Sequence, residues 1–385
     1  MKAAAVSTDV SESAEAGRDL ATQIMGKLGT PADAIILFAA PEHDHAHLLA
    51  ALKQASPSGV IVGASSAGEF TNEVHGAGLA CALALKGDDV AFAAVVGRDI
   101  KRDPVAAARQ IASGFSGPSA SQFEHRAALV LTDALAGYAD VLVDELTLVT
   151  AGQYQFFGGG AGDNAQFQRT TVFCGQEVLS DAVVALEILS SKPLGVGVSH
   201  GWEPASRPLR VTEADGMRLI GLDGLPAIEA FEEHAETTGN FVDRSEPIPF
   251  FLHNILGIDT GAGYRLRVPL VVLPDGAVLC AAEIPAGAIV RIMRTTHASA
   301  VEAAERAADA AVGSMSGRPV AALFFDCVAT RLRMGDQFAE ELAGLQGRIG
   351  SVPLVGCNTH GQIARAEGQF QGFHNCTAVV CAFPE

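Results

Sequence analysis

The chain has 385 residues, 49% of them hydrophobic, and its formal net charge is −18 at pH 7. This length predicts one large or two medium domains, and the apolar content excludes a disordered chain. The negative charge, with no Lys/Arg-rich run to oppose it, disfavours a nucleic-acid partner, and the lack of a long apolar run predicts a cytoplasmic protein with no signal peptide and no membrane insertion.

The N-terminal part of the chain alternates strand-like and helix-like runs, which predicts α/β construction. Residues 34–41 (AIILFAAP) read as a buried strand, and residues 45–56 (HAHLLAALKQAS) have helical spacing. Residues 59–70 (GVIVGASSAGEF) read as a strand that ends in a loop of small residues. In that loop, GASSAG is one residue too long for a G-x-S-x-G nucleophile elbow, so we do not expect Ser65 or Ser66 to be catalytic.

Histidines cluster before the first of these helices, in the stretch PEHDHAHLL. A metal ion could bridge His43 and His47, which lie four residues apart and would share a helical face. The simpler interpretation, which we favour, is a solvated helix start with Asp44 near the N-cap.

The middle of the chain repeats the same order, through residues 127–133, 138–150, 154–164 and 181–189. Its loop, QFFGGGAGDN, fails as a P-loop because no Lys follows the glycines, and it fails as a dinucleotide fingerprint because Asp163 stands where the third glycine is required. Two interpretations stay open. The glycines either form a tight bend for close packing, or they admit a small polar ligand beside Asp163 and Asn164.

The sequence SHGWEP follows another apolar strand and contains the only tryptophan of the chain. His200, which emerges from the strand end beside Gly201 and Trp202, could stack on a ligand or bind haem iron as an axial ligand. The alternative is a core histidine whose ring nitrogens bind backbone groups.

A third version of the order occupies the C-terminal part, in residues 320–329, 336–346, 352–363 and 375–383. Cys327 lies at a strand end and would need a histidine base from elsewhere in the chain to act as a nucleophile. Arg331 could bind a ligand carboxylate, although a salt bridge with Asp326 or Asp336 is the simpler expectation. His374 and Asn375 come just before the last strand.

Seven cysteines are present, none in a C-x-x-C motif. Most stand in apolar strand-like runs, so we expect buried small side chains in a reducing cytoplasm.

The three versions align at their loop ends, Gly68-Glu69, Gly162-Asp163 and Gly361-Gln362. Helix-strand units repeated in this way predict related subdomains. Ligands of open α/β sheets bind outside the carboxyl ends of strands. We therefore expect the three loops to converge and to line one pocket.

Six segments in order resemble the FIST family of paired N- and C-terminal sensory domains: GVIVGASSAGEF, FFGGGAGDN, GVGVSHGWEP with RVTEADGMRLIGLDGLPAIEAF, ALFFDCVATR, PLVGCNTHGQIA and GFHNCT. The resemblance implies a FIST N-terminal-like domain over residues 1–225 and a FIST C-terminal-like domain over residues 226–385. It implies an α/β fold of two related sheet-based subdomains. The last loop departs from the family pattern, because Gln362 stands where an acid is usual.

The resemblance further implies a non-catalytic sensor of a small, amino-acid-like ligand, which acts on a separate partner such as a histidine kinase. The alternatives are a haem-based nitric-oxide sensor, with His200 or His374 as axial ligand, and an enzyme that uses Cys327. Haem is the only cofactor that the sequence brings into question. The expected ligand-binding residues are Gly63, Ser65, Ser66, Gly68, Glu69, Gly158, Gly159, Gly160, Asp163, Asn164, Cys327, Arg331, Gly361 and Asn375.

Overall fold

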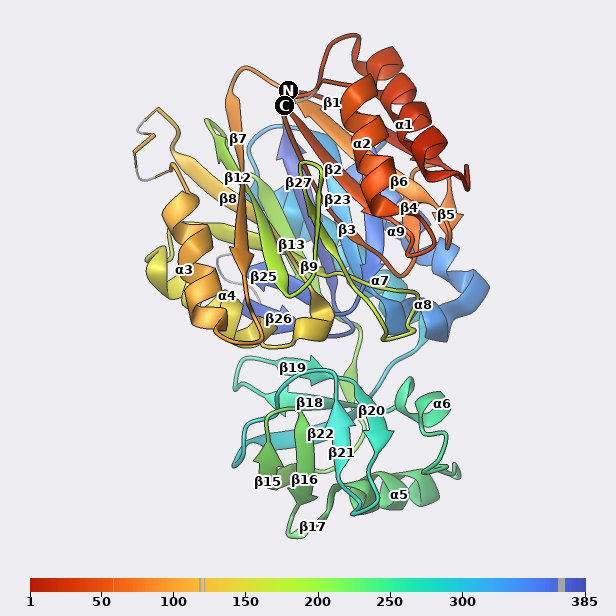
Figure 1. Ribbon diagram of the computed structural model, residues 1–385. Helices are drawn as coiled ribbons and strands as arrows, with labels where there is room; N and C mark the ends of the chain where they lie inside the picture. The colour runs from red at the N-terminus through yellow and green to blue at the C-terminus, as the bar shows by residue number, and fades with distance from the viewer. Residues whose placement is uncertain (58, 118, 121, 366–370) are drawn as a thin grey trace.

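The computed structural model describes residues 1–57, 59–117, 119–120, 122–365 and 371–385, and it has two lobes (Figure 1). The larger lobe contains three six-stranded sheets, and the smaller lobe is formed by the segment between β13 (Gly195–Ser199) and α7 (His297–Ser314). Both termini lie together at the end of the larger lobe that is far from the smaller one (Figure 1). The α/β class predicted from the sequence is confirmed.

The larger lobe is built from three units with the same order of elements. The first unit comprises β1 (Lys2–Thr8), α1 (Ser13–Leu28), β2 (Ala34–Ala39), α2 (His45–Ala55), β3 (Val60–Ser65), β4 (Glu69–Thr71), β5 (His75–Gly76) and β6 (Ala80–Lys86). The second comprises β7 (Val90–Arg98), α3 (Pro104–Gly114), β8 (His125–Thr132), η1 (Ala134–Ala136), α4 (Ala139–Val149), β9 (Gln155–Gly160), β10 (Val172–Cys174), β11 (Glu177–Leu179) and β12 (Ala182–Ser190).

The third unit is interrupted by the smaller lobe. It comprises β13, α7, β23 (Pro319–Cys327), α8 (Val328–Met334), η2 (Gly335–Gln337), α9 (Phe338–Ile349), β24 (Leu354–Thr359), β25 (Gln362–Arg365), β26 (Gln371–His374) and β27 (Ala378–Pro384).

The three sheets have one topology, and each contains two strands from another unit. The strand orders are β1-β6-β2-β3-β10-β11, β7-β12-β8-β9-β25-β26 and β13-β27-β23-β24-β4-β5. In each unit the strand after the small-residue loop therefore leaves its own sheet and pairs with the neighbouring one. This cyclic exchange ties the units together and brings their three loops to a common point.

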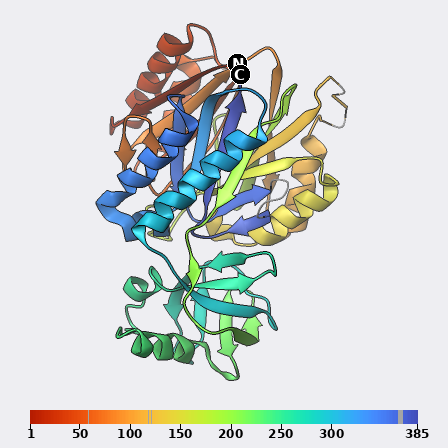
Figure 2. The ribbon, with the colours of Figure 1, turned by 180° about the vertical axis from the view of Figure 1, so that it is seen from behind.

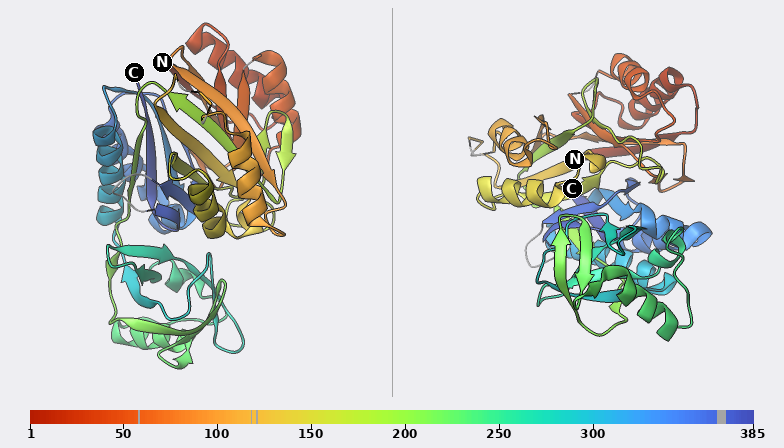
Figure 3. Two further views of the ribbon diagram at one scale, coloured as in Figure 1. Left: turned by 90° about the vertical axis from the view of Figure 1, so that its left-hand side faces the viewer. Right: turned by 60° about the horizontal axis from the view of Figure 1, so that its bottom comes forward.

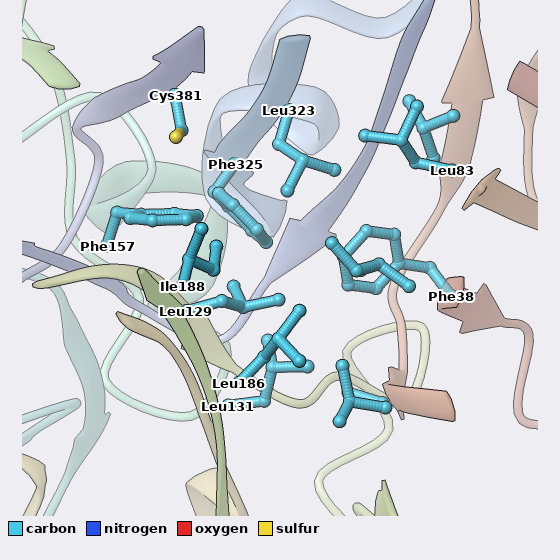
Figure 4. Close-up of a cluster of buried hydrophobic side chains, with 14 of the residues drawn as sticks. Phe38, Leu83, Leu129, Leu131, Phe157, Leu186, Ile188, Leu323, Phe325 and Cys381 are labelled. Carbon is cyan, nitrogen blue, oxygen red and sulfur yellow. The ribbon is translucent and has the colours of Figure 1, made fainter. Parts of the chain in front are cut away.

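The inner faces of the three sheets pack into a single core. Phe38 of the first sheet and Phe325 of the third meet edge to face at 5.6 Å between ring centroids. Leu129, Leu186 and Phe157 of the second sheet point toward the same centre (Figure 4). The strands are nearly continuous apolar runs because helices cover their other face.

The outer faces are covered by helix pairs: α1 and α2 on the first sheet, α3 and α4 on the second, and α7 and α9 on the third (Figure 2). Helix α7 can lie close to β13 because its contact face is alanine and because β13 contains glycine. A Cβ at Gly197 would stand 1.9 Å from the Ala307 carbonyl oxygen. The predicted N-cap Asp44 is confirmed at the start of α2, where it accepts hydrogen bonds from Ala46 and His47.

The smaller lobe is a separate body with its own apolar core (Figure 3). The sequence-based division between residues 225 and 226 falls inside this lobe, within β17. Its elements are β14 (Glu203–Pro204), β15 (Leu209–Asp215), β16 (Arg218–Leu222), β17 (Leu225–Pro226), α5 (Ala227–Thr237), α6 (Ile248–Phe251), β18 (Ile255–Asp259), β19 (Tyr264–Arg267), β20 (Pro269–Val272), β21 (Val278–Cys280) and β22 (Ile289–Arg294).

None of the helices within the described ranges combines the length and the apolarity needed to cross a bilayer.

Candidate functional site

The three small-residue loops meet, as the sequence predicts. The Asn358 carbonyl accepts a hydrogen bond from the Ala67 amide at 2.9 Å, and the Gly68 carbonyl accepts one from the Asn358 amide at 2.8 Å. The Gly162 amide donates to the Ser65 carbonyl at 2.8 Å, and the Gly160 amide donates to Gly361 at 2.9 Å. The expectation of a shared pocket is not met at this point, because the loops of the first two units pack directly against each other: a Cβ at Gly162 would stand 2.8 Å from that of Ala67.

Glu69 and Gln362 occupy equivalent places in the first and third units. The Ser66 hydroxyl donates to Glu69 Oε1 at 2.5 Å, and the Leu79 amide donates to Glu69 Oε2 at 3.1 Å. In the third unit, Gln362 Nε2 donates to the Thr359 hydroxyl at 2.8 Å, and the Thr377 amide donates to Gln362 Oε1 at 3.2 Å. Both side chains tie a loop to the start of the unit's last strand, and burial raises the pKa of Glu69 to about 7.

Replacing Glu69 with glutamine should make the protein more stable at pH 8. The raised pKa means that the folded state binds more protons than the unfolded state between about pH 4.5 and 7, so the stability of the wild type falls over that range as pH rises, by about 3 kcal/mol. Glutamine would make the bonds that Gln362 already makes. Urea unfolding of E69Q at pH 5 and pH 8 measures the difference.

The matched control for Glu69→Gln is the reverse change, Gln362→Glu, which places a buried acid at the equivalent position. It should lower the free energy of unfolding at pH 8. A Glu69→Gln variant that is less stable than the wild type at pH 8 would show that the charge of Glu69 is needed.

In the second unit the strand register places Val172 where Glu69 and Gln362 stand, because the three residues face Ala64, Cys357 and Gly159 respectively. The sequence alignment that placed Asp163 at the position of Glu69 and Gln362 was therefore wrong, because the strand register gives that position to Val172.

Asp163 does not occupy the position equivalent to Glu69 and Gln362. It stabilises its own loop through hydrogen bonds. It accepts hydrogen bonds from the amides of Phe167, Gln168 and Arg169, and Asn164 Nδ2 donates to Glu42. His360 Nε2 lies 3.5 Å from Asp163 Oδ1, and its ring stacks on Phe167. Burial lowers the pKa of His360 to about 4.

A buried polar cluster lies beneath α8, at the carboxyl ends of β23 and β24. We call it the α8 cluster. Asp326 and Asn358 are neighbours on the two parallel strands, and Glu341 projects from α9; these three side chains are 1%, 0% and 1% exposed. Its members are Asp326, Thr330, Arg331, Arg333, Glu341 and Asn358.

Several polar atoms of the α8 cluster lack a hydrogen-bond partner in the described part of the chain. They include both amide atoms of Asn358 and one oxygen each of Asp326 and Glu341. The Nε atoms of Arg331 and Arg333 are also unpartnered. Buried polar groups are nearly always hydrogen-bonded in folded proteins, so this concentration of exceptions makes the α8 cluster the candidate site.

The carboxyl groups of the cluster resist ionisation. Burial raises the pKa of Asp326 and of Glu341 well above the usual range, the charge of Asp326 raises that of Glu341 further, and Arg333 opposes both shifts. One arginine faces two acids in a low-dielectric site, which favours the protonated form of at least one of the two carboxyl groups.

The fold itself does not require these polar side chains. The positions of Asp326 and Asn358 correspond to Ala39 and Ser65 in the first unit. In the second unit they correspond to Thr132 and Gly160. Only the third unit places a carboxyl and an amide side by side under its helix, which indicates a function beyond packing.

The cluster also includes part of the predicted loop region. A Cβ at Gly68 would stand 2.8 Å from Asn358 Oδ1 and 3.1 Å from Arg331 Cδ and Nε, so both side chains pack closely against this glycine. The simpler expectation for Arg331 was wrong: among the described residues, no ion pair joins it to Asp326 or Asp336, and its guanidinium faces Glu69 instead.

The remaining expected residues divide into two groups. Gly63, Gly158 and Gly159 lie inside strands, where close backbone neighbours leave no room for a side chain. Cys327, at the start of α8, and Asn375 lie at the junction of the lobes, where Asn375 Oδ1 accepts from the Val268 amide at 3.4 Å.

Haem does not fit the two proposed axial histidines as they stand. His200 Nε2 lies 3.2 Å from the Tyr264 carbonyl and its Nδ1 accepts from the Trp202 amide at 3.3 Å, so both ring nitrogens are engaged. His374 is 2% exposed, and a macrocycle could reach it only after the surrounding side chains moved apart. Within the described ranges, no group of three or more His, Cys, Asp or Glu could hold a metal ion.

Sequence reasoning missed Glu341, Asn358 and Arg333. A signal for Glu341 was present, because it falls on the apolar stripe of its helix with Phe338, Leu342, Leu345 and Ile349, where a carboxylate is out of place. Asn358 and Arg333 had no comparable signal.

A hollow of about 260 Å³, which includes open solvent, lies beside the two chain termini. Figure 1 shows these termini together at the far end of the larger lobe. The hollow is lined by Met1, Gly87, Asp89, Val90, Ser190, Ser191, Lys192, Pro384 and Glu385. It is the alternative location for a small ligand.

Comparison with known proteins gives two family matches. The FIST N domain model matches residues 33–225 and the FIST C domain model matches residues 227–365. An uncharacterized protein of Mycobacterium tuberculosis strain H37Rv is 25% identical over 264 residues, which cover 67% of this chain and 68% of the relative. An uncharacterized protein of Mycobacterium bovis is 24% identical over 244 residues, 59% of each chain.

Proposed function

Because this chain belongs to the FIST family, whose domains are signal-transduction sensory domains, we propose that it is a non-catalytic cytoplasmic sensor whose small ligand binds at the α8 cluster. Its output would be read by a separate signalling protein, such as a histidine kinase. The free thiols of the described cysteines agree with a reducing compartment.

The observation that carries the proposal is the amide of Asn358. It is 0% exposed, neither its oxygen nor its nitrogen has a partner among the described residues, and it lies beside the equally buried Asp326. Leaving such a group unpaired costs about 1–3 kcal/mol. A ligand that bonds the amide and the carboxyl oxygens would recover that free energy, which makes the cluster a source of binding affinity.

The polar atoms favour a zwitterionic, amino-acid-like ligand. An ammonium group suits the carboxyl oxygens of Asp326 and Glu341, and it would draw them into their ionised forms. A carboxylate suits the guanidinium of Arg331, which is half-buried and, like Asn358, packs closely against Gly68.

Helix α8 gives the site a route to the smaller lobe. This seven-residue helix carries Arg331 toward the loop of the first unit and Arg333 toward the smaller lobe, where the guanidinium carbon lies 5.6 Å from the centre of the Trp202 ring. A ligand that repositions α8 would therefore change the contact between the lobes. The partner protein would read the relative population of the two arrangements.

Asn358→Leu should weaken amino-acid binding by about 10- to 100-fold, because one or two buried hydrogen bonds to the ligand are lost. Leucine is close in size to asparagine, and no hydrogen bond of the Asn358 side chain within the described residues is lost with it. Calorimetric titration with a panel of the twenty amino acids measures the effect.

The matched control is Ser65→Ala, which alters the equivalent position of the first unit. It should bind the ligand as the wild type does. A ligand that binds Asn358→Leu and wild type equally would remove the α8 cluster from the account, and loss of binding in Ser65→Ala alone would move the site to the first unit.

A further inference from the structure

Two cysteines lie in one buried cluster at the junction of the lobes. Cys327 ends β23 and Cys376 precedes β27, and both belong to the apolar cluster around Trp202. Cys376 is the neighbour that most lowers the pKa of the Cys327 thiol, and the amides of Cys376 and Ala329 and the side chain of Gln362 act in the same direction. Each of these neighbours carries a proton that can face the Cys327 sulfur.

The second unit places a carboxyl group at this position. Asp133 stands where Cys327 stands, because each directly follows the residue that pairs with Gly160 in the second unit and with Asn358 in the third. Its carboxylate accepts from the amides of Leu135 and Asp181, which correspond to those of Ala329 and Cys376. The fold therefore directs equivalent backbone amides at a carboxyl group in one unit and toward the position of a thiol in the other.

The backbone at Cys376 is equally fixed by the fold. Its φ of 49° lies in the left-handed region, as do those of its equivalents Asp181 at 50° and Gly78 at 82°. The turn is a property of all three units, so the conformation requires no sulfur. What distinguishes the third unit is that both positions carry a thiol.

The other buried cysteines have different surroundings. Burial raises the pKa of Cys280 to about 12 and those of Cys81, Cys357 and Cys381 well above the usual range. At the pair, the neighbouring Cys376 is the largest cause that lowers the pKa of Cys327 to about 6, while the neighbouring Cys327 and burial raise the pKa of Cys376. A thiol with a lowered pKa beside a second thiol is the arrangement that disulfide chemistry uses.

We propose that Cys327 and Cys376 form a redox-active pair that hydrogen peroxide converts to a disulfide. The Cys327 thiolate attacks one peroxide oxygen, the O–O bond breaks, and the leaving hydroxide takes up a proton, which gives water and a sulfenic acid at Cys327. The Cys376 sulfur then attacks the sulfenic sulfur, and its proton leaves with the hydroxyl as a second water.

The low exposure of the two cysteines limits the size of an oxidant that can reach them. Cys327 is 4% exposed and Cys376 is 5% exposed, so only a molecule close to water in size can reach them without opening the lobes. The inference does not depend on the ligand proposed for the α8 cluster, although Cys327 begins the helix that carries Arg331 and Arg333.

The test is peptide mapping of the full-length protein after brief treatment with equimolar hydrogen peroxide, followed by denaturation and alkylation. The expected result is a Cys327–Cys376 crosslinked peptide that dithiothreitol removes, with two fewer of the seven cysteines alkylated. Equal alkylation of Cys327, Cys376 and Cys381 would overturn the proposal, as would a sulfinic acid at Cys327 without the crosslink.

Three serine variants assign the roles. In Cys376→Ser, dimedone should trap a sulfenic acid at Cys327, whereas in Cys327→Ser dimedone should label Cys376 at least about ten-fold less. Cys381→Ser is the matched buried control and should form the crosslink as the wild type does. Equal labelling of Cys376 and Cys327 would contradict the assignment of the nucleophile. If a serine variant fails to fold, the crosslink in the wild type still decides the proposal.

Discussion

Replacing Arg267 with methionine should lower the free energy of unfolding by about 3–5 kcal/mol. Arg267 is 1% exposed and joins the smaller lobe to the larger one. Its Nη2 donates to both oxygens of Asp140 on α4 at 3.0 Å, Nη1 donates to the Phe373 carbonyl at 3.3 Å, and Nε donates to the Glu283 carbonyl at 2.9 Å.

The loss of stability is large because the buried hydrogen-bond partners of Arg267 remain in the variant without a donor. Burial already raises the pKa of Asp140, and Arg267 is the main charge that opposes the shift. Without it, Asp140 would be a buried carboxylate with only Arg265 nearby, at 3.6 Å. The folded-state pKa of Asp140 would rise further, so the deficit of the variant should grow as pH rises above about 4.

Urea unfolding followed by circular dichroism measures the Arg267 effect, with Arg265→Met as the matched control. Arg265 is one-third exposed at its side chain and should cost about 1 kcal/mol or less. A double variant, Arg267→Met with Asp140→Leu, should regain more than half of the loss because no unpaired charge remains. Equal effects of the two arginine variants would contradict the role given to Arg267.

Replacing Asp326 with asparagine should raise stability and abolish tight ligand binding together. At pH 8 the free energy of unfolding should increase by about 1–3 kcal/mol, because a buried acid with a raised pKa is removed. Asparagine keeps an oxygen for the hydrogen bonds from Thr330 and the Cys327 amide. Binding should weaken by at least about ten-fold, because the ammonium group loses a carboxylate.

The pH dependence gives the sign of the Asp326 effect. The raised pKa values of Asp326 and Glu341 mean that the folded state binds more protons than the unfolded state above about pH 4, so wild-type stability falls as pH rises. The advantage of Asp326→Asn should therefore be small at pH 4 and largest at pH 8. Unfolding curves at the two pH values, with Glu341→Gln as the parallel variant, measure it.

The opposite signs of the two Asp326 effects separate a functional residue from a structural one. If a side chain serves packing, its substitution lowers the free energy of unfolding. If it serves ligand binding and is itself destabilising, its substitution raises the free energy of unfolding while binding is lost. An Asp326→Asn variant that is less stable than the wild type at both pH values would show that the carboxylate contributes to the stability of the fold.

Much of the larger lobe followed from sequence, because strand, helix and loop alternate with clear periodicity and the order recurs three times. That the three loops meet also followed from the rule for strand ends. The exchange of hairpins between sheets did not, since the strands β4, β10 and β25 are short and carry no mark of the sheet that they join. Pairing between distant segments is a tertiary property that local pattern does not encode.

The candidate site was only partly predictable. Arg331 and Gly68 were expected to bind ligand, and they lie beside the α8 cluster. Asp163 appeared equivalent to Glu69 because both follow a glycine, but an insertion before β10 shifts the register of the second unit. Asn358 stood unmarked inside a strand, because its significance depends on the absence of a partner in space, which a sequence does not display.

The most direct test of the α8 cluster as the ligand site is hydrogen–deuterium exchange of the full-length protein with and without the tightest-binding amino acid. Slower exchange is expected in residues 326–341 and 356–362, and the hollow between Met1 and Lys192 should be unaffected. Protection confined to that far-end hollow, with α8 unchanged, would contradict the account.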